Sequence, residues 1–235
     1  MNKTIIAVSA LLAASLPTNA VILSVDAVDN IYGAGHSTAP APGGGSAGTL
    51  PPSFTFAAGP GQVVTFSSVT GTATLTTSFG LFPPDGNPST SFPMDLLSFG
   101  GISGIKCDTS GFMAGVFLGP AEPVNPAPAI LNFGVAGIGT AFATLSPLIN
   151  QMFYIGDGLT GHGSGSQQQF IVPATATALY LGFPDAPAYT GAPGAYQDNG
   201  GTLTATFNVV PEPSSTMLLV GGCVARFANR RRKHT

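Results

Sequence analysis

Residues 202–209 (TLTATFNV) alternate between apolar and polar side chains, and this stretch decides the fold class. Leu203, Ala205, Phe207 and Val209 occupy the odd positions, whereas threonines and Asn208 occupy the even ones. Successive side chains of a strand point to opposite faces. The pattern therefore predicts a β-strand with one buried face and one solvated face.

Short runs rich in β-branched and aromatic residues predict further strands between clusters of turn residues. These runs are residues 62–69, 73–79, 111–118, 130–133, 152–155, 167–172 and 178–183. Gly- and Pro-rich stretches at residues 32–52 and 119–128 predict loops. Gly and Pro recur every few residues and are the two poorest helix formers, which argues against helices between the termini. We therefore expect an all-β domain at residues 21–209, a β-sandwich of the jelly-roll, galactose-binding-like kind.

The charges of the chain are few and unevenly placed. Only 7% of the 235 residues are charged. Of the seven Lys and Arg residues, only Lys106 lies within residues 21–209, against nine Asp and Glu residues there. An acidic domain repels phosphate backbones, which argues against nucleic acid as a partner and favours a divalent cation. Cys107 lies in the domain and Cys223 in the C-terminal tail, so removal of the tail would leave no intramolecular disulfide.

The N-terminus has the three parts of a signal peptide. Lys3 gives a positive start, residues 4–16 form an apolar core, and residues 17–20 (PTNA) combine a helix breaker with a small final residue. Because the apolar core is too short to span a bilayer comfortably, we expect residues 1–20 to be a signal peptide cleaved after Ala20. The alternative is an N-terminal helix buried in the domain.

The C-terminus, residues 210–235, also has an ordered set of parts. The sequence Pro211-Glu212-Pro213 precedes an apolar run at residues 216–225 and a basic cluster that ends at Lys233. The two prolines keep the motif extended, and the basic cluster would remain cytoplasmic while the apolar run enters the inner membrane. This arrangement resembles the PEP-CTERM sorting signal. The resemblance implies a C-terminal sorting helix, transient inner-membrane insertion, processing by an exosortase, and delivery to the cell surface or extracellular space. The alternative is a weak membrane anchor that is not processed.

A second set of motifs lies in the C-terminal half of the domain. It comprises residues 111–119 (GFMAGVFLG), 153–156 (FYIG), 170–173 (FIVP), 179–182 (LYLG), Asp185, and 193–202 (PGAYQDNGGT). These motifs resemble the PA-I galactophilic lectin family, and the resemblance is clearest over residues 111–209. It implies a calcium-dependent β-sandwich that binds carbohydrate.

Three residues here carry hard oxygen donors: Asp185, Asp198 and Asn199. Calcium is bound by six to eight oxygen ligands of this type. The resemblance implies that these three residues bind Ca²⁺ together with the Ala195 carbonyl, and that a carbonyl near Thr70 or Gly71 adds to the set. In that family, two sugar hydroxyls complete the calcium shell. The family's His and Gln sugar contacts cannot be placed on the loop at residues 83–88, so the sugar-binding residues stay unknown. The alternative is that residues 198–201 (DNGG) form an ordinary hairpin turn.

Three functional hypotheses follow. We expect a non-enzymatic surface or exopolysaccharide-matrix protein that uses calcium to bind glycans. A structural or adhesion protein of the matrix with no ligand would show the same low charge and the same tail. A secreted hydrolase would need an acid and a base in one cleft, and the scattered carboxylates give no such spacing. His36 and His162 both lie in loops, which offers little for a catalytic triad or a two-histidine metal centre.

Overall fold

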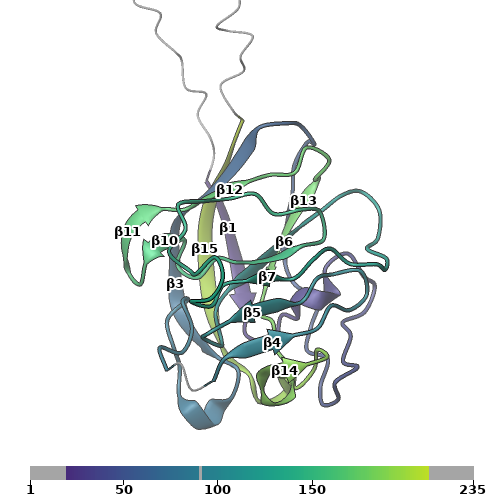
Figure 1. Ribbon diagram of the computed structural model, residues 1–235, viewed down its shortest axis with the longest axis vertical. Coiled ribbons are helices and arrows are strands. Elements are labelled where there is room, and N and C mark those ends of the chain that lie inside the picture. Colours follow the sequence, from purple (N-terminus) through teal and green to yellow (C-terminus); the bar gives the residue numbers. More distant parts are fainter. Residues whose placement is uncertain (1–19, 90–91, 212–235) are drawn as a thin grey trace, which may run out of the picture.

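The computed structural model describes residues 20–89 and 92–211, which form a β-rich fold without an α-helix (Figure 1). The largest sheet has the strand order β1-β15-β3-β12-β8. Its members are β1 (Val21–Asp26), β15 (Gly200–Pro211), β3 (Gln62–Thr74), β12 (Gln169–Ile171) and β8 (Thr144–Leu145). Antiparallel pairing of β3 with β15 along the full length of β15 forms the backbone of this sheet. The predicted all-β class is confirmed.

Two smaller sheets and a hairpin complete the fold. The second sheet has the order β2-β13-β6-β9, formed by Ser53–Thr55, Ala178–Gly182, Ala114–Leu118 and Met152–Tyr154. The third has the order β14-β4-β5-β7, formed by Thr190–Gly191, Met94–Leu96, Ile105–Cys107 and Leu131–Asn132. The hairpin is β10 (Leu159–Gly161) with β11 (Ser164–Gln167). Four short 3-10 helices lie in the connections: η1 (Ile31–Gly33), η2 (Thr77–Phe79), η3 (Pro187–Tyr189) and η4 (Tyr196–Asp198).

Aromatic side chains join the first two sheets into a sandwich. Phe207 of β15 meets Phe54 of β2 edge to face, with ring centroids 5.8 Å apart. Phe170 of β12 packs on Phe153 of β9 at 5.2 Å. Such pairs contribute roughly 0.5–1.5 kcal/mol each beyond the area they bury. The two layers therefore share one continuous apolar core.

Strand β15 has the two faces that its alternation predicts. Leu203, Ala205 and Phe207 are fully buried, whereas Thr202 and Thr204 are exposed. The register shifts by one residue between Thr206 and Phe207, which marks a β-bulge in the partner strand β3.

The prediction of a separate strand at residues 73–79 is wrong. Strand β3 continues through the expected turn as far as Thr74, and Thr77–Phe79 forms η2. The chain continues because Gly71 adopts φ +102° and lies against the Thr202 carbonyl, where a Cβ would collide with the oxygen. Gly71 therefore allows the two strands to approach closely. In the sequence, however, a glycine is more readily interpreted as part of a turn.

Several strands carry no clear sequence signal. Short strands such as β2, β4, β5 and β14 have two or three residues each, too few to show a period. Strand β1 directly follows the expected signal peptide and pairs with β15 from Val21 opposite Phe207 to Asp26 opposite Thr202. The expected strand at residues 167–172 is divided, because Gln168 is buried between β11 and β12.

Candidate metal and ligand site

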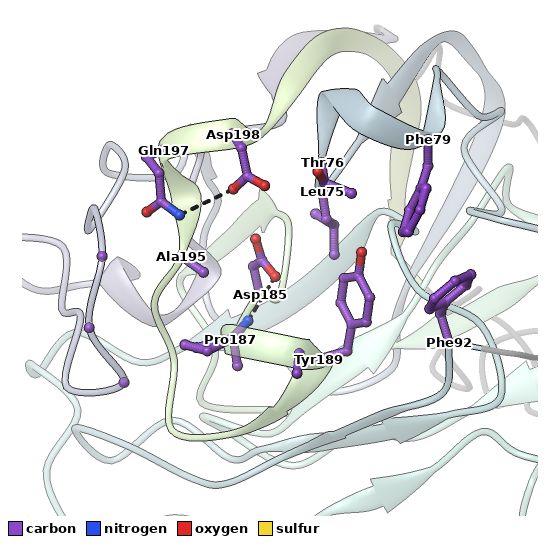
Figure 2. Close-up of a pocket in the computed structure, with 15 residues that line it drawn as sticks. Leu75, Thr76, Phe79, Phe92, Asp185, Pro187, Tyr189, Ala195, Gln197 and Asp198 are labelled. Carbon is purple, nitrogen blue, oxygen red and sulfur yellow. Dashed lines mark hydrogen bonds between the residues drawn. The ribbon is translucent and has the colours of Figure 1, made fainter.

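A cavity of about 550 Å³ lies at the end of the sandwich where β15 begins. Segments far apart in the sequence surround it, as Figure 2 shows. They are residues 43–45, 75–76, Phe79, Phe92, 185–189, Ala195 and 197–198. We call this space the ligand cavity. Asp185, Ala195 and Asp198 all line this cavity, and Asn199 is the next residue in the chain.

Asp185 is the most unusual polar side chain in the cavity wall. It lies just beyond β13 and is only 1% exposed. Its Oδ1 accepts the Ala186 N–H at 2.8 Å, but its Oδ2 is buried without a hydrogen-bond partner. The pKa of this carboxyl is raised to about 8, chiefly by burial and also by the Asp198 carboxylate, against the lowering effect of hydrogen bonds from the Ala186 N–H and the Asn199 side chain. A buried carboxylate oxygen without a donor is costly unless a proton or a cation satisfies it.

Asn199 presents a second buried oxygen of the same kind. Its amide nitrogen donates to the Ala27 carbonyl at 2.9 Å, which fixes the orientation of the side chain. Its Oδ1 is then buried without a partner. The Asn199 side chain also interacts with the Asp185 carboxyl through a hydrogen bond that lowers the pKa of Asp185, in addition to its bond with Ala27. Two buried oxygens therefore lack a donor in this corner.

The main chain around the cavity is held in unusual conformations. Ala188, Tyr189 and Ala195 have φ of 54°, 60° and 72°, which residues with a Cβ rarely adopt. Each such residue costs of the order of 1 kcal/mol or more and persists only where its surroundings enforce it. Ala195 also precedes η4, which carries Asp198 into the cavity wall. Strain of this kind is concentrated at ligand sites in proteins.

No cationic side chain within residues 20–89 and 92–211 neutralises this corner. Lys106 is the only Lys or Arg there, and it pairs with Asp95 at 2.8 Å. His36 pairs with Glu122, also at 2.8 Å. Only a proton or an external cation is therefore left to neutralise Asp185 and Asp198.

The donor types in this corner suit calcium. The described part of the chain contains no group of three or more His, Cys, Asp or Glu side chains placed to hold a metal together. A cation here would therefore depend on two carboxylates, the Asn199 amide oxygen and main-chain carbonyls such as that of Ala195. Calcium accepts this mixture, whereas zinc favours His and Cys ligands.

One expected contribution to the metal site is wrong. Thr70 and Gly71 lie within the β3–β15 ladder, opposite Thr204 and Leu203. Residues 75–76, which directly follow β3, line the cavity instead. Because β3 continues through Gly71, its backbone reaches the cavity four or five residues later than a turn at that glycine would place it.

A second wall of the cavity, formed by the glycine run at residues 43–45, was not predicted. The Gly43 N–H donates to the Pro193 carbonyl at 2.8 Å, and the Ala195 N–H donates to the Gly44 carbonyl at 3.0 Å. These bonds attach the Gly/Pro-rich loop to the segment that precedes η4. Gly44 has φ +95°, and a Cβ there would meet no atom within 4 Å. The loop was predicted, but its partner some 150 residues away was not.

A second acidic cluster is satisfied within the fold. Asp85 accepts the Tyr154 hydroxyl at 2.9 Å and the Asp157 N–H at 3.1 Å, both at Oδ1. Its Oδ2 lies 3.7 Å from His162 Nδ1, and burial raises its pKa. Asp157 in turn accepts backbone N–H groups of the β10–β11 region. Protein donors occupy these carboxylates, so this cluster holds loops in place.

Comparison with known proteins identifies one element, at the C-terminus. Residues 209–233 match the PEP-CTERM protein-sorting motif. No curated protein and no solved structure gave a significant match to the chain. The lectin-like resemblance of the domain therefore stays a prediction.

The position of the matched motif relates it to the cavity. Pro211 is the last residue of β15, whereas Glu212 and Pro213 lie outside the described residues, as do residues 1–19 of the expected signal peptide. Asp198 and Asn199 precede the opposite end of β15. None of the helices in residues 20–89 and 92–211 is long and apolar enough to cross a membrane. The sorting motif supports an exosortase substrate that is exported to the cell surface or extracellular space after transient membrane association.

Proposed function

We propose that the exported domain is a non-enzymatic module that binds carbohydrate with the help of Ca²⁺ in the ligand cavity. The observation that carries the proposal is the pair of buried, unpartnered oxygens, Asp185 Oδ2 and Asn199 Oδ1, in a corner without a cationic side chain. Asp198 and the Ala195 carbonyl would complete the protein's share of the ligands. Bound calcium would present open coordination positions, which hydroxyl oxygens of a sugar can fill.

A hydrolase would use the same carboxylates differently. A raised pKa on Asp185 beside Asp198 suits an acid and base pair. However, the acid must reach the glycosidic oxygen, and Asp185 is almost entirely buried, with one oxygen already bonded to the Ala186 N–H. Burial therefore favours binding over catalysis. In a ligand-free matrix protein a proton would satisfy Asp185 Oδ2 in place of a cation, and the calcium experiments below distinguish the two cases.

Glycan binding should require calcium. We expect the exported protein to bind a subset of an array of bacterial and host glycans in calcium buffer, and to lose that binding when EDTA removes the metal. Asp198→Ala should bind none of them, because the charged ligand at the mouth of the cavity is lost. Asp95→Ala serves as the matched control, since Asp95 pairs with Lys106 on the third sheet. Silence of the wild-type protein on the array and with purified exopolysaccharide would favour the ligand-free matrix protein.

Processing at both termini is a further prediction. We expect the surface-extracted protein to begin near Val21 and to end close to Pro211-Glu212-Pro213, because both sites join small or extended residues to a short apolar run. Intact-mass measurement of protein extracted from the cell surface checks both ends. Recovery of the whole 235-residue chain from the cytosol would contradict this prediction.

A further inference from the structure

The ligand cavity has two unlike halves. Carboxylates and main-chain polar groups lie on one side, and Phe79, Phe92 and Tyr189 lie on the other (Figure 2). We call these three residues the aromatic wall. The rings of Phe79 and Phe92 have centroids 4.8 Å apart, and Phe92 meets Tyr189 edge to face at 5.9 Å. The three rings come from η2, from the segment before β4, and from η3, so tertiary folding alone assembles the wall.

The aromatic wall lies at the edge of the sandwich core. Phe79 is 47% exposed and Phe92 is half-buried, and neither belongs to the buried core cluster, whereas Tyr189 is half-buried and packs against that cluster. The apolar surface that Phe79 and Phe92 leave in water is surface that a ligand could bury. Such an arrangement is typical of surfaces that receive a ligand with one apolar face. The face of a pyranose ring that carries axial C–H bonds fits an aromatic ring in this way.

Tyr189 connects the two halves of the cavity. Its side chain lies in the cavity wall between Phe92 and the acidic corner, by which we mean Asp185 and Asp198 (Figure 2). The strained backbone of Ala188 and Tyr189 holds the ring in this position. The polar and aromatic halves therefore form one continuous surface.

The size of the cavity indicates the size of its ligand. Pockets of roughly 300–1,000 Å³ usually hold drug-sized molecules, which are larger than a single pyranose ring. At about 550 Å³, the ligand cavity has room beyond a ring placed at the acidic corner. The space that remains lies along the aromatic wall.

We infer that the site takes a saccharide of more than one ring, with one ring at the acidic corner and its neighbour stacked on Phe79 and Phe92. The inference rests on the proposed function and adds the ligand class, an oligosaccharide or the end of a polysaccharide. Phe79 and Phe92 then determine chain-length preference, whereas Asp185, Asp198 and Asn199 determine the calcium requirement.

The test uses the absence of tryptophan from the natural chain. Phe79→Trp places a single indole on the aromatic wall, and the exposure of Phe79 leaves room for it. The probe is a size series from monosaccharide to tetrasaccharide, made by partial hydrolysis of the exopolysaccharide of the exporting cells. We expect the indole fluorescence to shift with the larger members and not with the monosaccharide. Phe99→Trp is the matched control, because Phe99 is a similarly exposed ring outside the cavity, and its signal should not change.

Truncation gives the corresponding energetic measurement. Phe79→Ala should weaken binding of the tetrasaccharide by about tenfold or more, the usual effect of removing an aromatic anchor, and leave monosaccharide affinity unchanged. Its calcium-induced thermal shift should equal that of the wild type, which shows that the fold and metal corner are intact. Equal affinity for all sizes, with a silent indole, would overturn the aromatic subsite while the proposed function stands. If no size binds in calcium buffer, both proposals fail.

Discussion

Millimolar calcium should raise the melting temperature of the exported protein by about 5–10 °C. A cation that binds only the folded state adds RT ln(1 + [Ca²⁺]/Kd), which is about 2.7 kcal/mol at a hundredfold excess over Kd. For a domain of this size each kcal/mol corresponds to about 2–4 °C. The gain arises because calcium satisfies Asp185 Oδ2 and Asn199 Oδ1, which are otherwise buried without partners. Thermal unfolding followed by circular dichroism, with calcium and with EDTA, measures the shift.

Variants distinguish the contribution of the proposed calcium ligands from that of other acidic residues. Asp198→Ala should abolish the shift, because too few oxygens remain to displace the water around the ion. Asp185→Asn should abolish it too, yet should stabilise the calcium-free protein at alkaline pH, because it removes a buried charge. Asp95→Ala should keep the full shift. A wild-type melting temperature that stays constant within a degree would refute the metal site, and the carbohydrate function that depends on it would also fail.

Calcium affinity should depend steeply on pH, falling about tenfold for each unit below about pH 8. Without metal, burial raises the pKa of Asp185 to about 8, so the carboxyl is protonated at neutral pH and must lose its proton before it can bind Ca²⁺. Between pH 8 and pH 6 the loss is therefore about fiftyfold, because the carboxyl is already half protonated at pH 8. Isothermal titration in buffers of different ionisation enthalpy should also detect close to one proton released per ion at neutral pH.

The calcium-free protein should show the opposite trend in stability. The pKa of Asp185 is raised above its unfolded value of 3.8, so the folded state binds more protons than the unfolded state between these two values. The contribution of Asp185 to the free energy of unfolding is then fully present below about pH 4 and is lost as the pH rises from about 4 to about 8. Calcium should reverse this decline. An affinity that stays constant between pH 6 and pH 8 would show that Asp185 does not bind the ion.

The sequence predicted the strands that are long enough to show their period. Residues 202–209 lie within β15, and residues 62–69, 111–118, 152–155 and 178–183 all overlap strands of the first two sheets. The prediction failed at residues 73–79, because a glycine inside a strand and a glycine in a turn look alike in one dimension. It also failed for β4 and β5. These strands are too short to show a pattern of their own, and pairing with neighbouring strands stabilises them.

The sorting tail and the candidate oxygen donors could be predicted from the sequence. Each is local: the PEP-CTERM parts follow one another at one end of the chain, and Ala195, Asp198 and Asn199 lie within five residues. The surroundings of those donors could not be predicted, because they come from distant parts of the chain. The fold places residues 43–45 against residues 193–195, assembles the aromatic wall from three connections, and buries Asp185 Oδ2 and Asn199 Oδ1 without a hydrogen-bond partner. The physical reason is that desolvation and ring packing depend on contacts between segments distant in sequence, and no local pattern encodes those contacts.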